Sequence, residues 1–266
     1  MRGSPFFMRG QPGRARRVGR WHHRATHRLE AAMTTFASLV VAAIAWVAVH
    51  IGVAGTAVRG AIVSRIGEKA FRGLFVVLSL ALLYWLGTAY GAAGPVRQLW
   101  IAPRWLVVAG MWLLLPATLL LVCAVSQPNP TSISGKGALE REEPATGMLR
   151  VTRHPMLWAF ILWAVVHLAA LGTLSALLLT GAILVTALVG MPSLDAKYAA
   201  RYPERWPRFA AATSIVPFVA IAQGRNRLVL REIGWLRPWL AIVLWGVLIA
   251  LHPLAFEVNP ARFFHG

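Results

Sequence analysis

Four histidines lie inside long apolar stretches of the chain or at their edges, and their type and position suit them to chemistry: His50, His154, His167 and His252. An ionisable side chain at membrane depth is costly and is therefore taken as functional until another role is found. Two neutral imidazoles from different helices are a common way for a helix bundle to hold haem iron. We therefore interpret His50 and His167 as candidate iron ligands. The alternative is that each ring bonds to a neighbouring hydroxyl or backbone carbonyl.

The nearest arginines place His50 and His167 at membrane depth. Nine residues separate His50 from Arg59, which corresponds to roughly 14 Å along a helix. His167 follows Arg153 by 14 residues, which corresponds to roughly 21 Å. Trp163, one turn before His167, could form the wall of a site for a flat ligand. An aromatic belt is the other explanation for tryptophans near the ends of membrane helices.

Arg153 and His154 precede Pro155, where an apolar stretch begins. Proline suits the first helical turn, and an interfacial arginine extends its head group toward water. The functional interpretation is that this fixed pair faces an anionic group or a polar ligand at the cytoplasmic rim. His252 lies 15 residues past the preceding arginine, roughly 22 Å. The following Pro253 disfavours helical geometry for it, so we expect it at the outer end of the last helix.

The segments that must position these residues are apolar helices. Hydrophobic residues make up 58% of the chain and charged residues only 14%, about half the usual charged fraction of soluble domains. The pattern predicts an all-α, polytopic membrane helical bundle of about six transmembrane helices, plus a short interfacial or re-entrant segment at Ser214–Ala222. The predicted spans are Phe36–Gly55, Leu74–Ala93, Arg104–Val125, two within Leu157–Met191 that meet at Gly172 and Thr173, and Pro238–Phe256.

Residues 1–32 form a basic segment without apolar periodicity, and we expect a disordered tail there. Its histidines have no acidic or cysteine partner, so a solvated tail is preferred to a metal site. The integral membrane domain is expected over residues 33–266. Met33 is a candidate natural start, because a basic tail on the outer side would contradict the topology that the connectors predict.

Positive charge is concentrated in alternate connectors. With six spans, the first, third and fifth connectors hold four, four and eight Lys or Arg residues, and the second, the fourth and the C-terminal tail hold two, none and one. Since positively charged connectors stay cytoplasmic, we predict a multi-pass protein of the bacterial inner membrane with the odd connectors inside. The net charge of +18 then faces the lipid bilayer surface, and nucleic acid is not an expected partner. Cys123 is the single cysteine, so no disulfide-linked partner is expected.

Several short motifs occur together in a specific order. They are His50-Ile-Gly, Asn129-Pro-Thr, the stretch from Gly147 to Trp158 that contains Arg-His-Pro, the Leu-Trp-Ala-Val-Val-His-Leu stretch that ends at Leu168, Pro217-Phe-Val-Ala with Gly224-Arg, and His252-Pro. In this order the chain resembles the NnrU family of bacterial membrane proteins, to which the 15-cis-zeta-carotene isomerases are related. The resemblance runs from Met33 to Pro260 and leaves out the basic tail.

The resemblance implies that haem b is ligated by His50 and His167. It also implies one of two roles: cis-trans isomerisation of an apolar polyene reached from the bilayer, or an association with denitrification and nitric oxide metabolism. The isomerases carry a cysteine three residues before the second histidine, linked to a redox-dependent change of ligand. Here that position is Ala164, which departs from the isomerase pattern.

Two other function classes remain open. Arg153-His154-Pro followed by Tyr198 and Tyr202 also resembles integral-membrane methyltransferases that use S-adenosylmethionine. Those enzymes place acidic residues before the tyrosines, where this chain offers only Asp195. The third class is a cofactor-free membrane accessory or transport protein. A haem protein predicts a Soret band that depends on His50 and His167.

Overall fold

The computed structural model describes residue 30 and residues 32–53, 55–130, 137–256 and 260–263. Nearly all of the predicted basic tail, residues 1–29, lies outside the described residues. The elements are the first helix, Ala32–Val53, with its π-helical end η1 (Ala48–Val53), then α2 (Ala57–Ile66), α3 (Glu68–Ala93), α4 (Arg104–Ser126), η2 (Ala138–Glu140), η3 (Gly147–Arg150), α5 (Pro155–Leu171), α6 (Leu174–Arg201), α7 (Trp206–Ala212), α8 (Val219–Ala222), α9 (Leu230–Ile233), α10 (Leu236–Phe256) and η4 (Pro260–Phe263).

The prediction of a polytopic membrane helical bundle is confirmed. Five helices are long and apolar enough to cross a membrane, and the apolar α5 has 17 residues. The turn between α5 and α6 falls where glycine and threonine predicted it. Gly172 takes the left-handed conformation that ends α5, and a Cβ there would collide with the carbonyl oxygen of Trp100. Thr173 then caps α6 by accepting a hydrogen bond from Ala176 N.

The first membrane segment differs from the prediction at its end. The helix stops at Val53, after a π-helical turn, and Thr56 caps a separate helix, α2, which carries Arg59. The predicted depth of His50 assumed one helix as far as Arg59. Because the helix ends earlier, His50 lies only three residues from its end.

Residues of the first and fifth connectors also belong to helices. α3 begins at Glu68 rather than Leu74, because the charges that delayed the predicted start neutralise one another: Glu68 accepts from Arg59 at 2.7 Å and from Arg72 at 2.8 Å. Helix α6 continues to Arg201, ten residues past the predicted limit at Met191. The predicted Ser214–Ala222 segment does not cross the bundle, and only Val219–Ala222 of it is helical.

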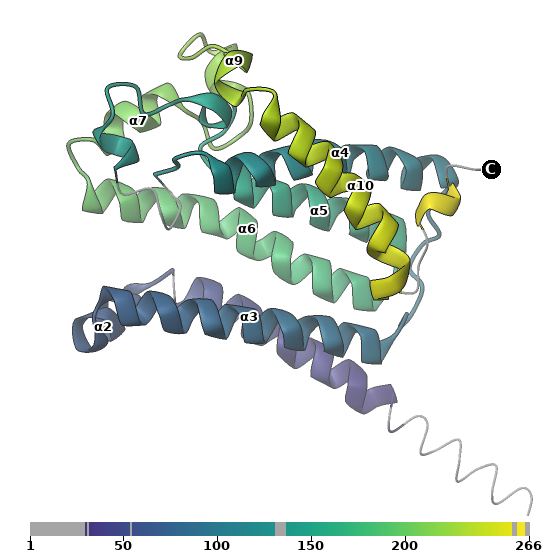
Figure 1. The fold of residues 1–266 in the computed structure, drawn as a ribbon. Helices are drawn as coiled ribbons and strands as arrows, with labels where there is room; N and C mark the ends of the chain where they lie inside the picture. The colour runs from purple at the N-terminus through teal and green to yellow at the C-terminus, as the bar shows by residue number, and fades with distance from the viewer. Residues whose placement is uncertain (1–29, 31, 54, 131–136, 257–259, 264–266) are drawn as a thin grey trace, which may run out of the picture.

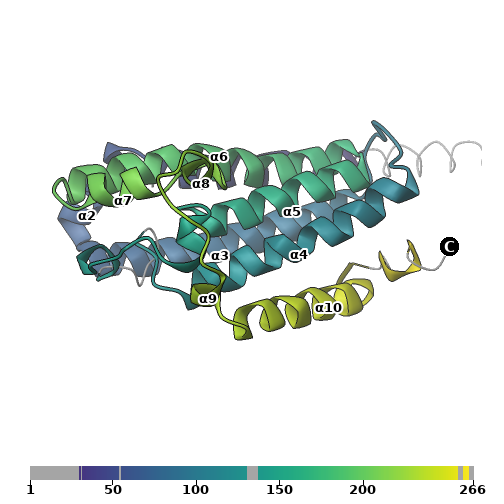
Figure 2. The same ribbon diagram turned by 90° about the horizontal axis from the view of Figure 1, so that it is seen from above.

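The long helices are arranged in two groups. α4, α5 and α6 lie side by side, and α10 packs across α4 (Figures 1 and 2). The first helix and α3 form a pair on the far side of α6 (Figure 1). Small residues allow the closest approach: Gly110 of α4 faces Val166 of α5 with no room for a side chain. The clusters of buried residues between these helices hold the bundle together.

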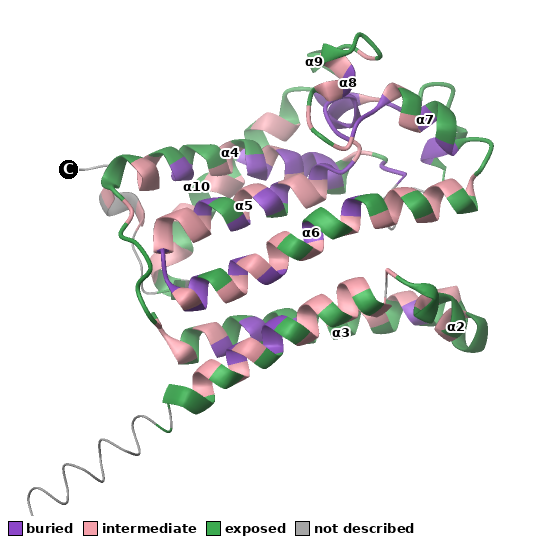
Figure 3. Ribbon diagram, turned by 180° about the vertical axis from the view of Figure 1, so that it is seen from behind, coloured by how far each residue is buried: buried purple, intermediate pink, exposed green. Residues whose placement is uncertain are grey.

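Apolar side chains also cover the outer surface. Leu74, Val77 and Leu80 on α3 are each more than 60% exposed, and most of α3 and α10 is coloured exposed or intermediate in Figure 3. Such an outward face suits lipid rather than water. The buried residues are concentrated in α4 and α5 and in the connecting segments beside α7 and α8 (Figure 3).

Connectors of like charge lie together. α2, α7 and α9, which belong to the arginine-rich first and fifth connectors, are at one end of the bundle (Figure 1). At the opposite end the second and fourth connectors meet, where Leu99 N donates to Gly172 O at 2.7 Å and Gln98 pairs with Thr173. The alternation of connectors assumed in the topology prediction is therefore present in the fold.

Candidate functional site

His50 lies in the π-helical end of the first helix. Its Nδ1 is 2.8 Å from the carbonyl oxygen of Trp46, and its ring stacks on the Trp46 indole with 4.0 Å between ring centroids. On the other side Phe75 of α3 meets the imidazole edge-on at 5.3 Å. Single π-helical turns occur often at functional sites. The ring is therefore held by its own helix and by α3.

His167 on α5 repeats this arrangement. Its Nδ1 is 2.8 Å from the carbonyl oxygen of Trp163, and the two rings stack with centroids 4.5 Å apart. In both helices a tryptophan precedes the histidine by four residues, which places the pair on one helical face. The sequence Trp-x-x-x-His thus forms the same local structure twice.

The hydrogen bond decides which ring nitrogen is available. A carbonyl oxygen can only accept, so Nδ1 of each histidine carries the proton and Nε2 of each neutral ring holds a lone pair. Neither Nε2 is engaged by another group within the described part of the chain. A histidine whose second nitrogen is fixed by a hydrogen bond is in the form that ligates a metal.

α6 lies between the two histidine-bearing helices, so the positions of their residues along the bundle can be compared through their contacts with α6. Trp46 packs on a cluster that contains Ala182, and Ile161, two residues before Trp163, belongs to a cluster that contains Ala187. Both tryptophans therefore lie beside the middle part of α6 and at a similar height in the bundle. The first helix and α5 run in opposite directions (Figure 1), so each histidine leans back toward that shared height. No hydrogen bond or ring contact joins the two histidines in the described chain.

His252 lies within α10, which continues through Pro253 and ends at Phe256. The helical geometry differs from the sequence prediction, while the location near the end of the last helix agrees with it. The ring contacts Phe256 with centroids 4.8 Å apart. The helix that carries His252, α10, packs against α4.

Arg153 and His154 are held together at the start of α5 by a residue from α6. His154 is only 2% exposed, and its Nε2 lies 2.9 Å from Asp195 Oδ1. Arg153 Nη1 is 3.6 Å from Asp195 Oδ2. The anionic group that these residues face is the chain's own Asp195. Because His154 is buried and engaged, this geometry disfavours the interpretation in which it is open to S-adenosylmethionine.

The backbone around His154 is bound to the segment that follows α7. Arg153 N donates to Ser214 O at 3.0 Å, and Thr152 Oγ1 donates to Ile215 O at 2.7 Å. Trp158 Nε1 donates to the same Ile215 carbonyl at 2.8 Å. The short segment predicted as interfacial or re-entrant therefore braces the beginning of α5.

A second ion pair, which sequence reasoning missed, joins η3 to α9. Arg150 donates two hydrogen bonds to Glu232 of α9, at 2.7 and 2.8 Å, and Gly147 N donates to the same carboxylate at 2.6 Å. The bond from Arg150 lowers the pKa of Glu232, and it raises the pKa of Arg150. Since 82 residues separate the partners, local sequence carried no signal that would have paired them.

Comparisons with known proteins place these features in a wider context. The family described as "NnrU protein" matches residues 38–260. A 15-cis-zeta-carotene isomerase, chloroplastic, of Arabidopsis thaliana is 30% identical over 177 residues, which are 60% of this chain and 44% of that protein. The Zea mays protein of the same name is 28% identical over 206 residues, 71% of this chain and 52% of its own length. The chain thus spans about half the length of these curated relatives. No solved structure gives a significant match.

Proposed function

The chain belongs to the NnrU family, and from that premise we propose that it is a membrane protein that binds haem b through His50 and His167. The observation that carries the proposal is the repeated Trp-x-x-x-His arrangement. Each ring is stacked on a tryptophan, and each Nδ1 is bonded to that tryptophan's carbonyl oxygen. Two neutral imidazoles, each with its Nε2 lone pair available, form a donor set that fits haem iron.

The residues of the chain would hold and shield the group. His50 and His167 would supply the two nitrogen ligands, and Trp163 would give a flat apolar wall beside His167. The Nδ1 bonds keep both rings in the ligating tautomer and restrict their rotation. When bound, haem would supply an iron centre that can change its redox state, or act as a Lewis acid, in an apolar environment.

The activity we favour is cis-trans isomerisation of an apolar polyene that enters from the bilayer. The printed name of the plant relatives supports this class of reaction, and the apolar outer faces of the helices suit a substrate dissolved in lipid. Ala164 is fully buried where the isomerases carry cysteine. A change of iron ligand to a thiolate at that position is therefore not part of the proposal.

A second candidate role is the handling of nitric oxide in denitrification. It is retained because the chain spans only about half of each isomerase, whereas the NnrU match covers most of the chain. The same two histidines would hold the haem in either role. In both we propose the bacterial inner membrane as the location, with the arginine-rich connectors in the cytoplasm.

The test is the absorption spectrum of the detergent-purified protein after addition of haem b. We expect a Soret band that is lost in the double variant His50→Ala/His167→Ala. His22→Ala/His23→Ala, which alters histidines of the basic tail, is the matched control and should leave the band unchanged. A wild-type protein that stays colourless, or a double variant with an unchanged spectrum, would overturn the assignment. Two assays separate the roles. An isomerase should convert an added cis-polyene to its trans isomer, whereas a protein that handles nitric oxide should show a shift of the Soret band when nitric oxide is added.

A further inference from the structure

Two buried polar atoms between the first helix and α3 lack hydrogen-bond partners within the described chain: Trp46 Nε1 and Ser79 Oγ. Two other hydroxyl groups in the spans are satisfied by their own helix. Thr88 Oγ1 donates to Tyr84 O at 3.0 Å, and Thr180 Oγ1 donates to Ala176 O at 2.7 Å. Because the hydrocarbon layer offers no water to an unpaired donor, these two atoms are exceptions that need a partner.

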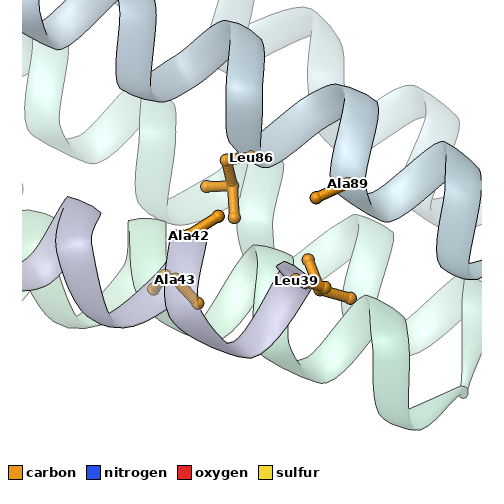
Figure 4. Packing of buried hydrophobic residues seen from close by; sticks show 6 residues of the cluster. Leu39, Ala42, Ala43, Leu86 and Ala89 are labelled. Atoms are coloured by element: carbon orange, nitrogen blue, oxygen red, sulfur yellow. The ribbon is translucent and has the colours of Figure 1, made fainter. Parts of the chain in front are cut away.

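The two atoms belong to facing sides of adjacent helices. Trp85 Nε1 of α3 donates to Ser38 Oγ at 3.2 Å near one end of the pair, and Phe75 meets His50 near the other. This antiparallel register puts Trp46 opposite Ser79 to within about one turn. Figure 4 shows Leu39 and Ala42 meeting Leu86 and Ala89 across the same interface. Trp46 lies one turn beyond Ala42 on that face of the first helix.

His50 completes the group. Its ring lies against Trp46 and Phe75, and Phe71 stacks on Phe75 with centroids 5.8 Å apart. The surroundings are therefore apolar, with three polar functions within about one helical turn of one another. The indole offers one N–H donor, the hydroxyl of Ser79 can donate or accept, and Nε2 of His50 offers a lone pair. If Nε2 ligates a metal, the two remaining functions can both donate to an acceptor.

We propose that Trp46 Nε1 and Ser79 Oγ bind an oxygen atom of a ligand held between the first helix and α3 beside His50. The ligand chemistry is a hydrogen-bond acceptor on a largely apolar molecule. It has two possible sources, a carboxylate of haem or a carbonyl of a separate molecule dissolved in the bilayer. The first source rests on the proposed function, and the second stands without it.

The experiment uses Trp46→Phe, which removes the N–H and keeps an aromatic ring, and Ser79→Ala, which removes the hydroxyl. Two matched probe pairs are titrated into the full-length detergent-purified protein: haem b against its dimethyl ester, and canthaxanthin, a polyene diketone, against β-carotene, the hydrocarbon with the same skeleton. Loss of one hydrogen bond to the ligand should weaken binding by roughly tenfold. Trp85→Phe is the control, because its indole N–H already has a partner in Ser38.

The outcomes separate the sources. A tenfold weaker affinity for haem b, with a smaller change for its ester, supports a haem carboxylate. A weaker affinity for canthaxanthin with β-carotene unchanged supports a ketone. Ser79→Ala should keep or raise the thermal midpoint of the ligand-free protein, since the hydroxyl that it removes is unpaired there. Unchanged affinity for all four probes, or a lowered midpoint of the ligand-free Ser79→Ala protein, would overturn this inference. A wild type that binds no haem overturns the proposed function instead.

Discussion

Polar side chains find their hydrogen-bond partners in opposite ways in two regions of the molecule. At the end of the bundle where α7 and α9 lie, His154 and Arg153 meet Asp195, and Arg150 meets Glu232. Among the membrane helices, His50 and His167 each use one ring nitrogen on their own helix and leave the other available. A histidine bonded to a carboxylate from elsewhere in the chain serves the fold. One whose second nitrogen is left available suits a ligand.

The largest effect expected in the connector region comes from Glu232→Ala. It would remove the carboxylate that accepts from Arg150 and Gly147 N, and the buried Arg150 guanidinium would keep only its bond to Asn226 Oδ1. We expect the free energy of unfolding to fall by about 3 kcal/mol. Thermal unfolding of the purified protein measures the change. Glu140→Ala is the control, because the Glu140–Arg205 pair is more than half exposed, and it should cost under about 0.5 kcal/mol.

The Glu232→Ala variant also tests whether the connector region and the histidine-bearing spans are independent of each other. In the folded Glu232→Ala protein, the affinity for haem b should equal that of the wild type, because Glu232 has no contact with the histidine-bearing spans among its described bonds. A change in haem affinity as large as the change in stability would show that the two regions are not separate.

A smaller effect is expected from Asp195→Asn. The amide oxygen can still accept from His154 Nε2, but the charge that attracts Arg153 is lost. We expect a loss of about 1–2 kcal/mol in the free energy of unfolding. The same exchange at exposed Glu204, Glu204→Gln, is the matched control. Equal midpoints for the two variants would mean that the Asp195 cluster adds nothing to stability.

The smallest effect is a pH dependence. The hydrogen bond from Arg150 lowers the pKa of Glu232 in the folded protein, below the ordinary glutamate value of about 4.3. Its contribution to stability is therefore complete above about pH 4.3. It is lost as the pH falls through the folded pKa. The thermal midpoints of the wild type and Glu232→Gln should differ at neutral pH and converge in acid. A constant difference down to the lowest pH at which both fold would contradict this assignment.

Sequence reasoning located most of the helices because local composition and end signals determine them. Arg104–Val125 was predicted and Arg104–Ser126 is observed, and the turn at Gly172 and Thr173 is where the left-handed glycine and the threonine cap occur. The break after Val53 was missed. An uncharged run does not reveal a π-helical turn, since that turn depends on how the helix end meets α2, α3 and α6.

In the candidate site, too, local sequence determined some features and packing between distant segments determined others. The order of residues alone determined that His50 and His167 each follow a tryptophan by four positions, and helical geometry then stacks each ring and bonds its Nδ1. Only the tertiary structure decided that Asp195 pairs with His154, and that Trp46 Nε1 and Ser79 Oγ are buried without a hydrogen-bond partner in the described chain. The first result follows from one turn of helix. The others depend on packing between segments distant in the chain, which no local pattern encodes.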